Sequence, residues 1–148
     1  MTTTTGQPGL ADALTRLSQL VAHVFADVSR SRDLTPQQAQ LLCTLLEGPV
    51  GMTDLGRLLH LEKSSLTGLV DRVERRGLVV RTRDPSDRRA SHVALTGQGA
   101  RLAAESHEDV TARLEALTGE LSPADRKRLA SAIATMLDRV VPEPNLVG

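Results

Sequence analysis

Residues 52–96 read MTDLGRLLHLEKSSLTGLVDRVERRGLVVRTRDPSDRRASHVALT, and this stretch decides the fold. Its first half predicts two short helices, one from Thr53 to about His60 and one from about Lys63 to Arg76. Thr53 is a residue type that caps helix N-termini. The second helix has an apolar stripe at helical spacing, made of Leu66, Leu69, Val70 and Val73. Gly77 then ends the helix, because glycine readily adopts the left-handed conformation of a helix stop.

The face of the second helix opposite this stripe carries short hydrogen-bonding groups near its start and cations further along. These residues are Ser64, Ser65, Thr67, Gly68, Asp71, Arg72 and Arg75. Short polar side chains and arginines can contact base edges in the major groove, and arginines also contact phosphates. The pattern is typical of a recognition helix in a helix-turn-helix protein.

After Gly77 the hydrophobic period changes from 3.6 to about 2 residues, which predicts a hairpin with strands at Leu78–Arg83 and Ser91–Leu95. Aspartate, proline and serine in the connection indicate a turn. Two arginines at its tip, Arg88 and Arg89, suit a narrow and negative minor groove. They would merely solubilise the tip if the hairpin did not meet DNA. We expect Asp87 to brace the Arg89 guanidinium in a bidentate pair.

The chain resembles the MarR-type regulators in this region. The segments that carry the resemblance are Lys63-Ser64-Ser65-Leu66-Thr67, then 69–79, then Asp87-Arg88-Arg89 and Val93-Ala94-Leu95-Thr96. Gly68 departs from the pattern, since many members carry a larger polar or basic residue there. The resemblance implies a homodimer that binds double-stranded DNA through Ser64, Ser65, Thr67, Gly68, Arg72, Arg75, Asp87, Arg88 and Arg89.

Charge is unevenly distributed along the chain. The protein has 18 basic and 18 acidic residues, yet residues 57–92 hold nine lysines and arginines against five acids. This window therefore carries a net charge of +4 and the remainder −4. The segregation indicates a nucleic-acid-facing surface, whereas the alternative is an ordinary solvated helix face.

The flanking segments predict four more helices. The first, Leu10–Ser31, has an apolar stripe too wide for one packing partner. The next begins after a capping-box signal at Thr35 and runs to about Glu47, with Leu41, Leu42, Leu45 and Leu46 facing inward. The third of these helices runs from about Gly97 to Leu117. The last begins at Ser122, which serves as its N-cap, and ends at about residue 141. Val50–Met52 predicts a third short strand.

These elements predict a mainly α fold in one domain, residues 1–148. It would be a winged helix-turn-helix lobe, about 35–96, with a small β-hairpin wing and additional dimerisation helices at about 10–31 and 97–141. The subunit interface would use the first helix and the last two. A small-molecule effector between the dimerisation helices and the lobe would change the spacing of the two recognition helices.

The sequence shows no catalytic arrangement, no phosphate-binding loop and no cofactor motif. Some members of the MarR family sense zinc through ligands on the first, second and fifth helices. His23, Cys43 and His107 lie on those helices here, so they are alternative metal ligands, although no ligand motif matches them. Cys43 lies in a leucine run, which favours a buried, inert thiol over a redox sensor.

No apolar run is long enough for a transmembrane helix, and the N-terminus lacks the features of a signal peptide. With its single cysteine, the chain is expected to be cytoplasmic. The sequence therefore predicts a ligand-responsive transcriptional repressor that binds a pseudo-palindromic operator as a homodimer and is not an enzyme. The alternatives are a winged helix that binds protein instead of DNA and, less favoured, a small α-helical enzyme.

Overall fold

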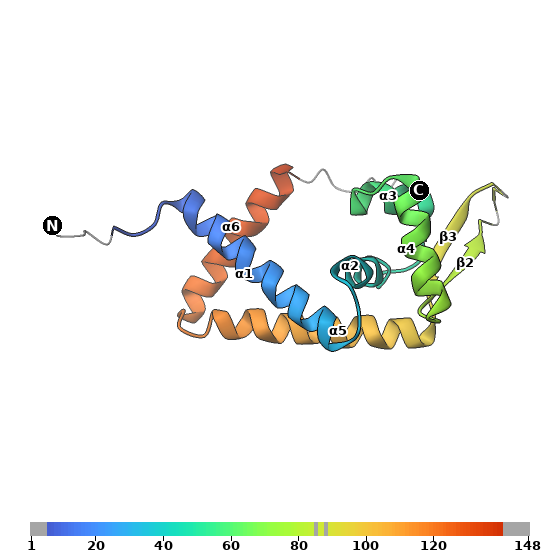
Figure 1. Cartoon of the computed structure of the whole chain (residues 1–148). Coiled ribbons are helices and arrows are strands. Elements are labelled where there is room, and N and C mark those ends of the chain that lie inside the picture. Colours follow the sequence, from blue (N-terminus) through green and yellow to red (C-terminus); the bar gives the residue numbers. More distant parts are fainter. Residues whose placement is uncertain (1–5, 85, 88, 141–148) are drawn as a thin grey trace. The chain divides into compact units, whose positions relative to one another are not determined.

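The computed structural model describes residues 6–84, 86–87 and 89–140. Arg88, one of the expected contact residues, lies outside them. The elements in chain order are α1 (Leu10–Ser31), α2 (Pro36–Thr44), β1 (Val50–Gly51), α3 (Met52–Leu59), α4 (Lys63–Arg75), β2 (Val79–Arg83), β3 (Ser91–Leu95), α5 (Gly97–Leu117) and α6 (Pro123–Val140) (Figure 1). The fold is mainly helical with a small antiparallel sheet, as the sequence predicts. The chain divides into two compact units, Met1–Ala112 and Arg113–Gly148.

The start of α2 confirms the predicted capping box. The Thr35 hydroxyl accepts a hydrogen bond from the Gln38 backbone N–H (3.2 Å), and the Gln38 side chain accepts one from the Thr35 N–H (3.1 Å). The prediction for the other end of this helix is wrong, because α2 ends at Thr44 instead of Glu47. The backbone N–H of Leu46 donates to Cys43 O (3.2 Å), so the chain tightens into i→i+3 turns. Leu46, predicted to face inward, is therefore exposed.

The sheet has the strand order β1-β3-β2, and the short strand predicted at residues 50–52 is confirmed as β1. Val50 pairs with Val93, and on the other side of β3 Val79 pairs with Leu95. This pairing explains why Thr53 is not a helix cap. Paired β1 carries extended backbone as far as Gly51, so α3 begins at Met52 with Gly51 as its N-cap. Thr53 lies exposed in the first turn.

The hydrophobic core of the first unit lies between α2, α3, α4 and the sheet. Its fully buried side chains include Leu41, Leu42, Leu55, Val70, Val73 and Val93, each with 0% exposure. Ala103 of α5 belongs to the same core cluster. The apolar stripe of α4 therefore faces this core, which leaves the opposite face of the helix to solvent.

The end of α4 and the start of α5 are joined by a compact set of hydrogen bonds. Gly77 has a positive φ of 74°, the left-handed conformation expected of a helix stop. The Thr96 hydroxyl donates to Gly77 O (2.6 Å) and accepts from the backbone N–H of Gly99 (3.0 Å). The Thr96 N–H also donates to Leu78 O (3.0 Å). The end of α4 and the first turn of α5 are thus held directly against each other.

In the second unit, Ser122 caps α6 as predicted, since its hydroxyl accepts from the Asp125 backbone N–H (3.2 Å). An ion pair between Arg126 and Glu115 joins α6 to the end of α5. Within α6, Pro123–Val140, no residue is buried, and most of its apolar stripe is exposed, namely Leu129, Met136, Leu137 and Val140. None of the helices in the described part of the chain combines the length and hydropathy needed to cross a bilayer.

Candidate nucleic-acid interface

The outer face of α4 is exposed as the sequence predicts. The four residues of the apolar stripe are buried, while Ser64, Ser65, Thr67, Arg72 and Arg75 are exposed. The Thr67 hydroxyl donates to Lys63 O one turn earlier (2.8 Å), so its oxygen lone pairs remain available to an outside donor. The Arg75 Nε donates to the backbone oxygen of Asp71 (3.3 Å). This face therefore presents hydroxyl groups near the helix start and guanidinium groups nearer its end.

Gly68 lies in the middle of this face and is only partly exposed. A Cβ atom added there would meet the guanidinium nitrogens of Arg72 at 3.9 and 4.0 Å, which is ordinary van der Waals contact. The backbone would therefore accept a larger side chain. Glycine at this position leaves the Arg72 guanidinium uncovered on that side.

The wing consists of β2, β3 and their connection, residues 79–95. The Ser86 hydroxyl (2.7 Å) and backbone N–H (2.9 Å) both donate to Asp84 Oδ1, and these hydrogen bonds lower the pKa of the Asp84 carboxyl. A second carboxylate, Asp87 Oδ1, accepts from the backbone N–H of Arg89 (2.9 Å). The expected bidentate brace from Asp87 to the Arg89 guanidinium is thus wrong, because this carboxylate caps the local turn and fixes the backbone of Arg89.

A groove of about 840 Å³ lies between α3, α4 and the wing. Lys63, Thr67 and Asp71 line it from α4, while Arg81, Arg89 and His92 line it from the wing. The structure thus brings Thr67 and Arg89 together on one groove. Ser64, Ser65, Gly68, Arg72 and Arg75 also lie on α4, but they are not among the residues that line this groove.

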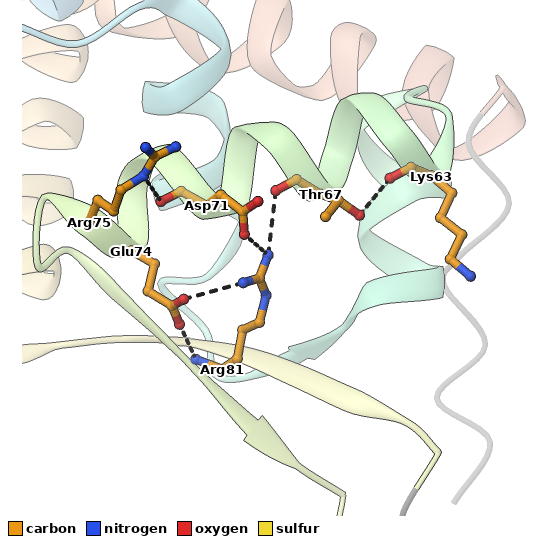
Figure 2. Close-up of polar contacts among 6 residues, drawn as sticks. All are labelled: Lys63, Thr67, Asp71, Glu74, Arg75 and Arg81. Carbon is orange, nitrogen blue, oxygen red and sulfur yellow. Dashed lines mark hydrogen bonds and ion pairs between the residues drawn. The ribbon is translucent and has the colours of Figure 1, made fainter.

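Arg81 also belongs to this site, although it is not among the contact residues that the sequence predicts. From β2 it reaches Asp71 Oδ1 (2.6 Å) and Glu74 Oε1 (3.2 Å) on α4, as Figure 2 shows. Asp71 and Glu74 are three residues apart, a spacing that places both on one side of a helix. An acid pair at this spacing followed by an arginine in the next strand is the signal that could have found the contact.

The C-terminal end of α4 is also attached to the turn between α1 and α2. Arg76 Nη1 donates to the backbone oxygen of Asp33 (2.6 Å) and to Gln38 Oε1 (3.3 Å). In the same turn Arg32 donates to Asp109 Oδ2 (3.0 Å) and to the backbone oxygen of Glu105 (3.3 Å) on α5. The end of α4 is thereby connected through one short turn to both α1 and α5.

The structure does not bring the alternative metal ligands together. Within the described residues, no group of three or more His, Cys, Asp and Glu side chains could hold a metal ion. His23 instead lies near Asp27 on α1, with 3.6 Å between Nε2 and Oδ2. Cys43 is half-buried instead of fully buried as predicted, and this burial raises the pKa of its thiol.

Comparisons with known proteins point to one family. A family model described as "MarR family" matches residues 32–90. The organic hydroperoxide resistance transcriptional regulator of Bacillus subtilis is 32% identical over 103 residues, covering 70% of this chain and 69% of that protein. The HTH-type transcriptional regulator FarR of Neisseria gonorrhoeae is 33% identical over 94 residues, or 63% of this chain. That match spans 64% of FarR.

Solved structures agree with the sequence matches. A MarR family protein from Bacillus stearothermophilus has a TM-score of 0.82 at 25% identity, over 88% of this chain and 92% of that one. NadR in complex with 4-hydroxyphenylacetate has a TM-score of 0.71 at 27% identity, over 92% and 97% of the two chains. The winged helix-turn-helix, its basic groove and these relatives lead to one conclusion: the chain belongs to the MarR family.

Proposed function

We propose that this protein is a transcriptional regulator rather than an enzyme, and that it acts as a repressor by binding operator DNA through α4 and the wing. The observation that carries the proposal is the exposed polar face of α4 beside a groove lined by Lys63 and Arg89. In this arrangement α4 enters the major groove and reads bases, while the wing reaches the adjacent minor groove. Contacts to phosphates set the position of the protein, and contacts to bases set its specificity.

We propose that the functional species is a homodimer on a pseudo-palindromic operator. The support comes from apolar side chains that remain exposed on α1 and α6. Examples are Leu14, Leu17 and Leu20 of α1 and Leu129, Met136 and Leu137 of α6. In a two-fold interface both subunits use the same surface, so an exposed apolar face of a helix is buried on both of them.

We also propose that a small-molecule effector regulates DNA binding. The similar protein NadR was solved with 4-hydroxyphenylacetate, which makes an organic ligand a reasonable expectation for this chain. The contacts of Arg76 and Arg32 supply a route, because they connect the end of α4 to α1 and α5. An effector that displaced those helices would change the placement of α4, and a coupling of about 1–3 kcal/mol suffices for a switch.

The proposal is tested by fluorescence anisotropy at fixed salt, with a duplex that the wild-type protein selects from random DNA and a scrambled duplex of equal length. The wild type should bind the selected duplex more tightly. Thr67→Ala should reduce this preference by about 1 kcal/mol, roughly fivefold, while binding to scrambled DNA stays unchanged. An equal loss on both duplexes would show that Thr67 does not read a base.

A matched control for this variant is Thr135→Ala on α6. The Thr135 hydroxyl donates to Ser131 O (3.0 Å), the same bond to the preceding turn that Thr67 makes to Lys63 O. Both variants remove that bond, but only Thr67 lies on the proposed interface. Thr135→Ala should therefore keep the preference of the wild type.

A second variant tests the wing. Arg89→Ala should weaken binding to the selected duplex by about 1–3 kcal/mol without changing thermal unfolding, because the exposed Arg89 side chain lies at the groove. Asp87→Ala should cause part of this loss, since its carboxylate holds the Arg89 backbone. Arg128→Ala on α6, which removes the same charge outside the proposed interface, should have little effect. If Arg89→Ala binds as tightly as the wild type, the assignment of the wing to DNA is wrong.

A further inference from the structure

Arg81 holds the wing against α4 through contacts with two acids. We propose that Arg81, Asp71 and Glu74 form a clamp that sets the angle of the wing to α4, so that Arg81 is a positioning residue for DNA binding. The inference rests on the proposed function, since it concerns the same interface. It assigns a role to two acids on a surface that would otherwise be expected to repel DNA.

The contacts of the clamp are made by both the side chain and the backbone of Arg81. Its Nη2 lies 2.6 Å from Asp71 Oδ1, and its Nη1 lies 3.2 Å from Glu74 Oε1 (Figure 2). Its backbone N–H donates to Glu74 Oε2 (3.0 Å). β2 is an edge strand, and this N–H donates to Glu74 on α4 instead of to β3. Glu74 therefore binds the wing at its backbone as well as at its guanidinium.

The clamp requires the shape of a guanidinium. Its planar fork presents several N–H donors in fixed directions, so it can bind two carboxylates at once and also approach the Thr67 backbone oxygen at 3.4 Å. A lysine ammonium is a single point charge and cannot satisfy both acids with the same geometry. The Arg81 side chain is only 28% exposed, so solvent screens these contacts less than it screens a pair at the tip of a loop.

The clamp also compensates negative charge beside the groove. Asp71 and Arg81 line the same groove as Thr67 and Arg89. Without Arg81, the Asp71 carboxylate would stand uncompensated in this groove, beside the proposed path of the phosphates. The clamp therefore has two effects that favour DNA, namely the compensation of this charge and the placement of the Arg89 backbone on the same hairpin.

Because of these two effects, removing either acid of the clamp should change the affinity for DNA in the direction opposite to the usual one. Removing an acid next to DNA normally tightens binding, because it removes repulsion with the phosphates. Glu74→Gln should instead weaken binding to the selected duplex by roughly three- to tenfold, because the amide cannot accept from both the guanidinium and the backbone N–H as the carboxylate does. Asp71→Asn breaks only the guanidinium contact and should weaken binding by a smaller factor.

The matched control is Glu62→Gln. Glu62 is the exposed N-cap of the same helix, and its side chain makes no capping hydrogen bond. It undergoes the same change of charge outside the clamp, so ordinary electrostatics apply and binding should stay the same or tighten. Fluorescence anisotropy at fixed salt with the selected duplex measures all three variants. Thermal unfolding of each variant, measured in parallel, confirms that the protein used is folded.

A double-mutant cycle shows whether Arg81 acts through the wing. Arg81→Gln should weaken binding by about tenfold or more in the wild type. The loss should be clearly smaller when Arg89 is already alanine, because only the loss of charge compensation then remains. Arg81→Lys should recover little of the loss, although it keeps the positive charge. If Arg81 contacted a phosphate itself, the losses from Arg81→Gln and Arg89→Ala would multiply, and Arg81→Lys would recover most of the affinity.

The inference is overturned if Glu74→Gln binds as tightly as the wild type or tighter, or if the cycle shows independent losses. In both cases the wild type still prefers the selected duplex, so the proposed function stands. If the wild type shows no such preference, the proposed function fails and the role of the clamp in DNA binding fails with it.

Discussion

Ile133→Asp should abolish both dimer formation and operator binding, although every residue of the proposed DNA interface on α4 and the wing stays in place. Ile133 lies on the apolar stripe of α6 and is only half-buried within its own chain. Its neighbours on the stripe, Met136 and Leu137, remain 45% and 55% exposed. In a two-fold interface the variant would bury an unpaired carboxylate from each subunit, at a cost of at least about 3 kcal/mol, or ~100-fold in the dissociation constant.

Sedimentation velocity at low micromolar concentration measures the assembly, and anisotropy with the selected duplex measures binding. The control is Ser131→Asp, which introduces the same charge on α6 away from the apolar stripe and should remain dimeric. A dimeric Ile133→Asp protein would show that this stripe is not the subunit interface. A wild type that sediments as a monomer would contradict the dimer itself.

The second large effect is expected at the joint between α4 and α5. A Cβ atom added at Gly99 would lie 1.8 Å from the backbone oxygen of Leu78 and 2.8 Å from its carbonyl carbon. Both atoms belong to the backbone, so neither can rotate away. Gly99→Ala should therefore force α5 off the end of the hairpin and lower the free energy of unfolding by about 2–4 kcal/mol. Thermal or urea unfolding measures this loss.

Gly97→Ala is the matched control two residues earlier in α5. A Cβ atom there meets only the Arg101 side chain, at 3.9 Å, and both positions lie in the first turn of the helix. Alanine is a better helix former than glycine, so this variant should be neutral or more stable by up to about 1 kcal/mol. If Gly99→Ala is as stable as Gly97→Ala, the close packing of α5 on Leu78 does not exist in solution.

Local signals predicted most of the fold. The stripe of the first helix gave its bounds, Leu10–Ser31, and the change of period after Gly77 gave β3 at Ser91–Leu95. The capping signals at Thr35 and Ser122 are both confirmed. Each of these features depends on residues within about four positions along the chain, the range over which helix and turn preferences act.

The errors occur where a distant segment changes the local preference. Thr53 has the residue type of a cap, but pairing of β1 with β3 moves the helix start to Met52. Asp87 has the charge to bind the Arg89 guanidinium, but it caps the turn of the hairpin instead. Arg81 has the local sequence of an ordinary strand residue, and it contacts Asp71 and Glu74 only because β2 lies beside α4. The exposed face of α4 was predictable from local spacing alone, whereas the contacts of Arg81 also depend on where β2 packs.

The most direct test of this account is to select duplexes bound by the wild-type protein from a random oligonucleotide library and to sequence them. A dimer with two copies of α4 predicts an inverted repeat whose half-sites are centred about one helical turn apart, roughly 34 Å or about 10 base pairs. It also predicts two protein chains on each selected duplex. Recovery of no enriched sequence, or of a single half-site bound tightly by one chain, would contradict the account.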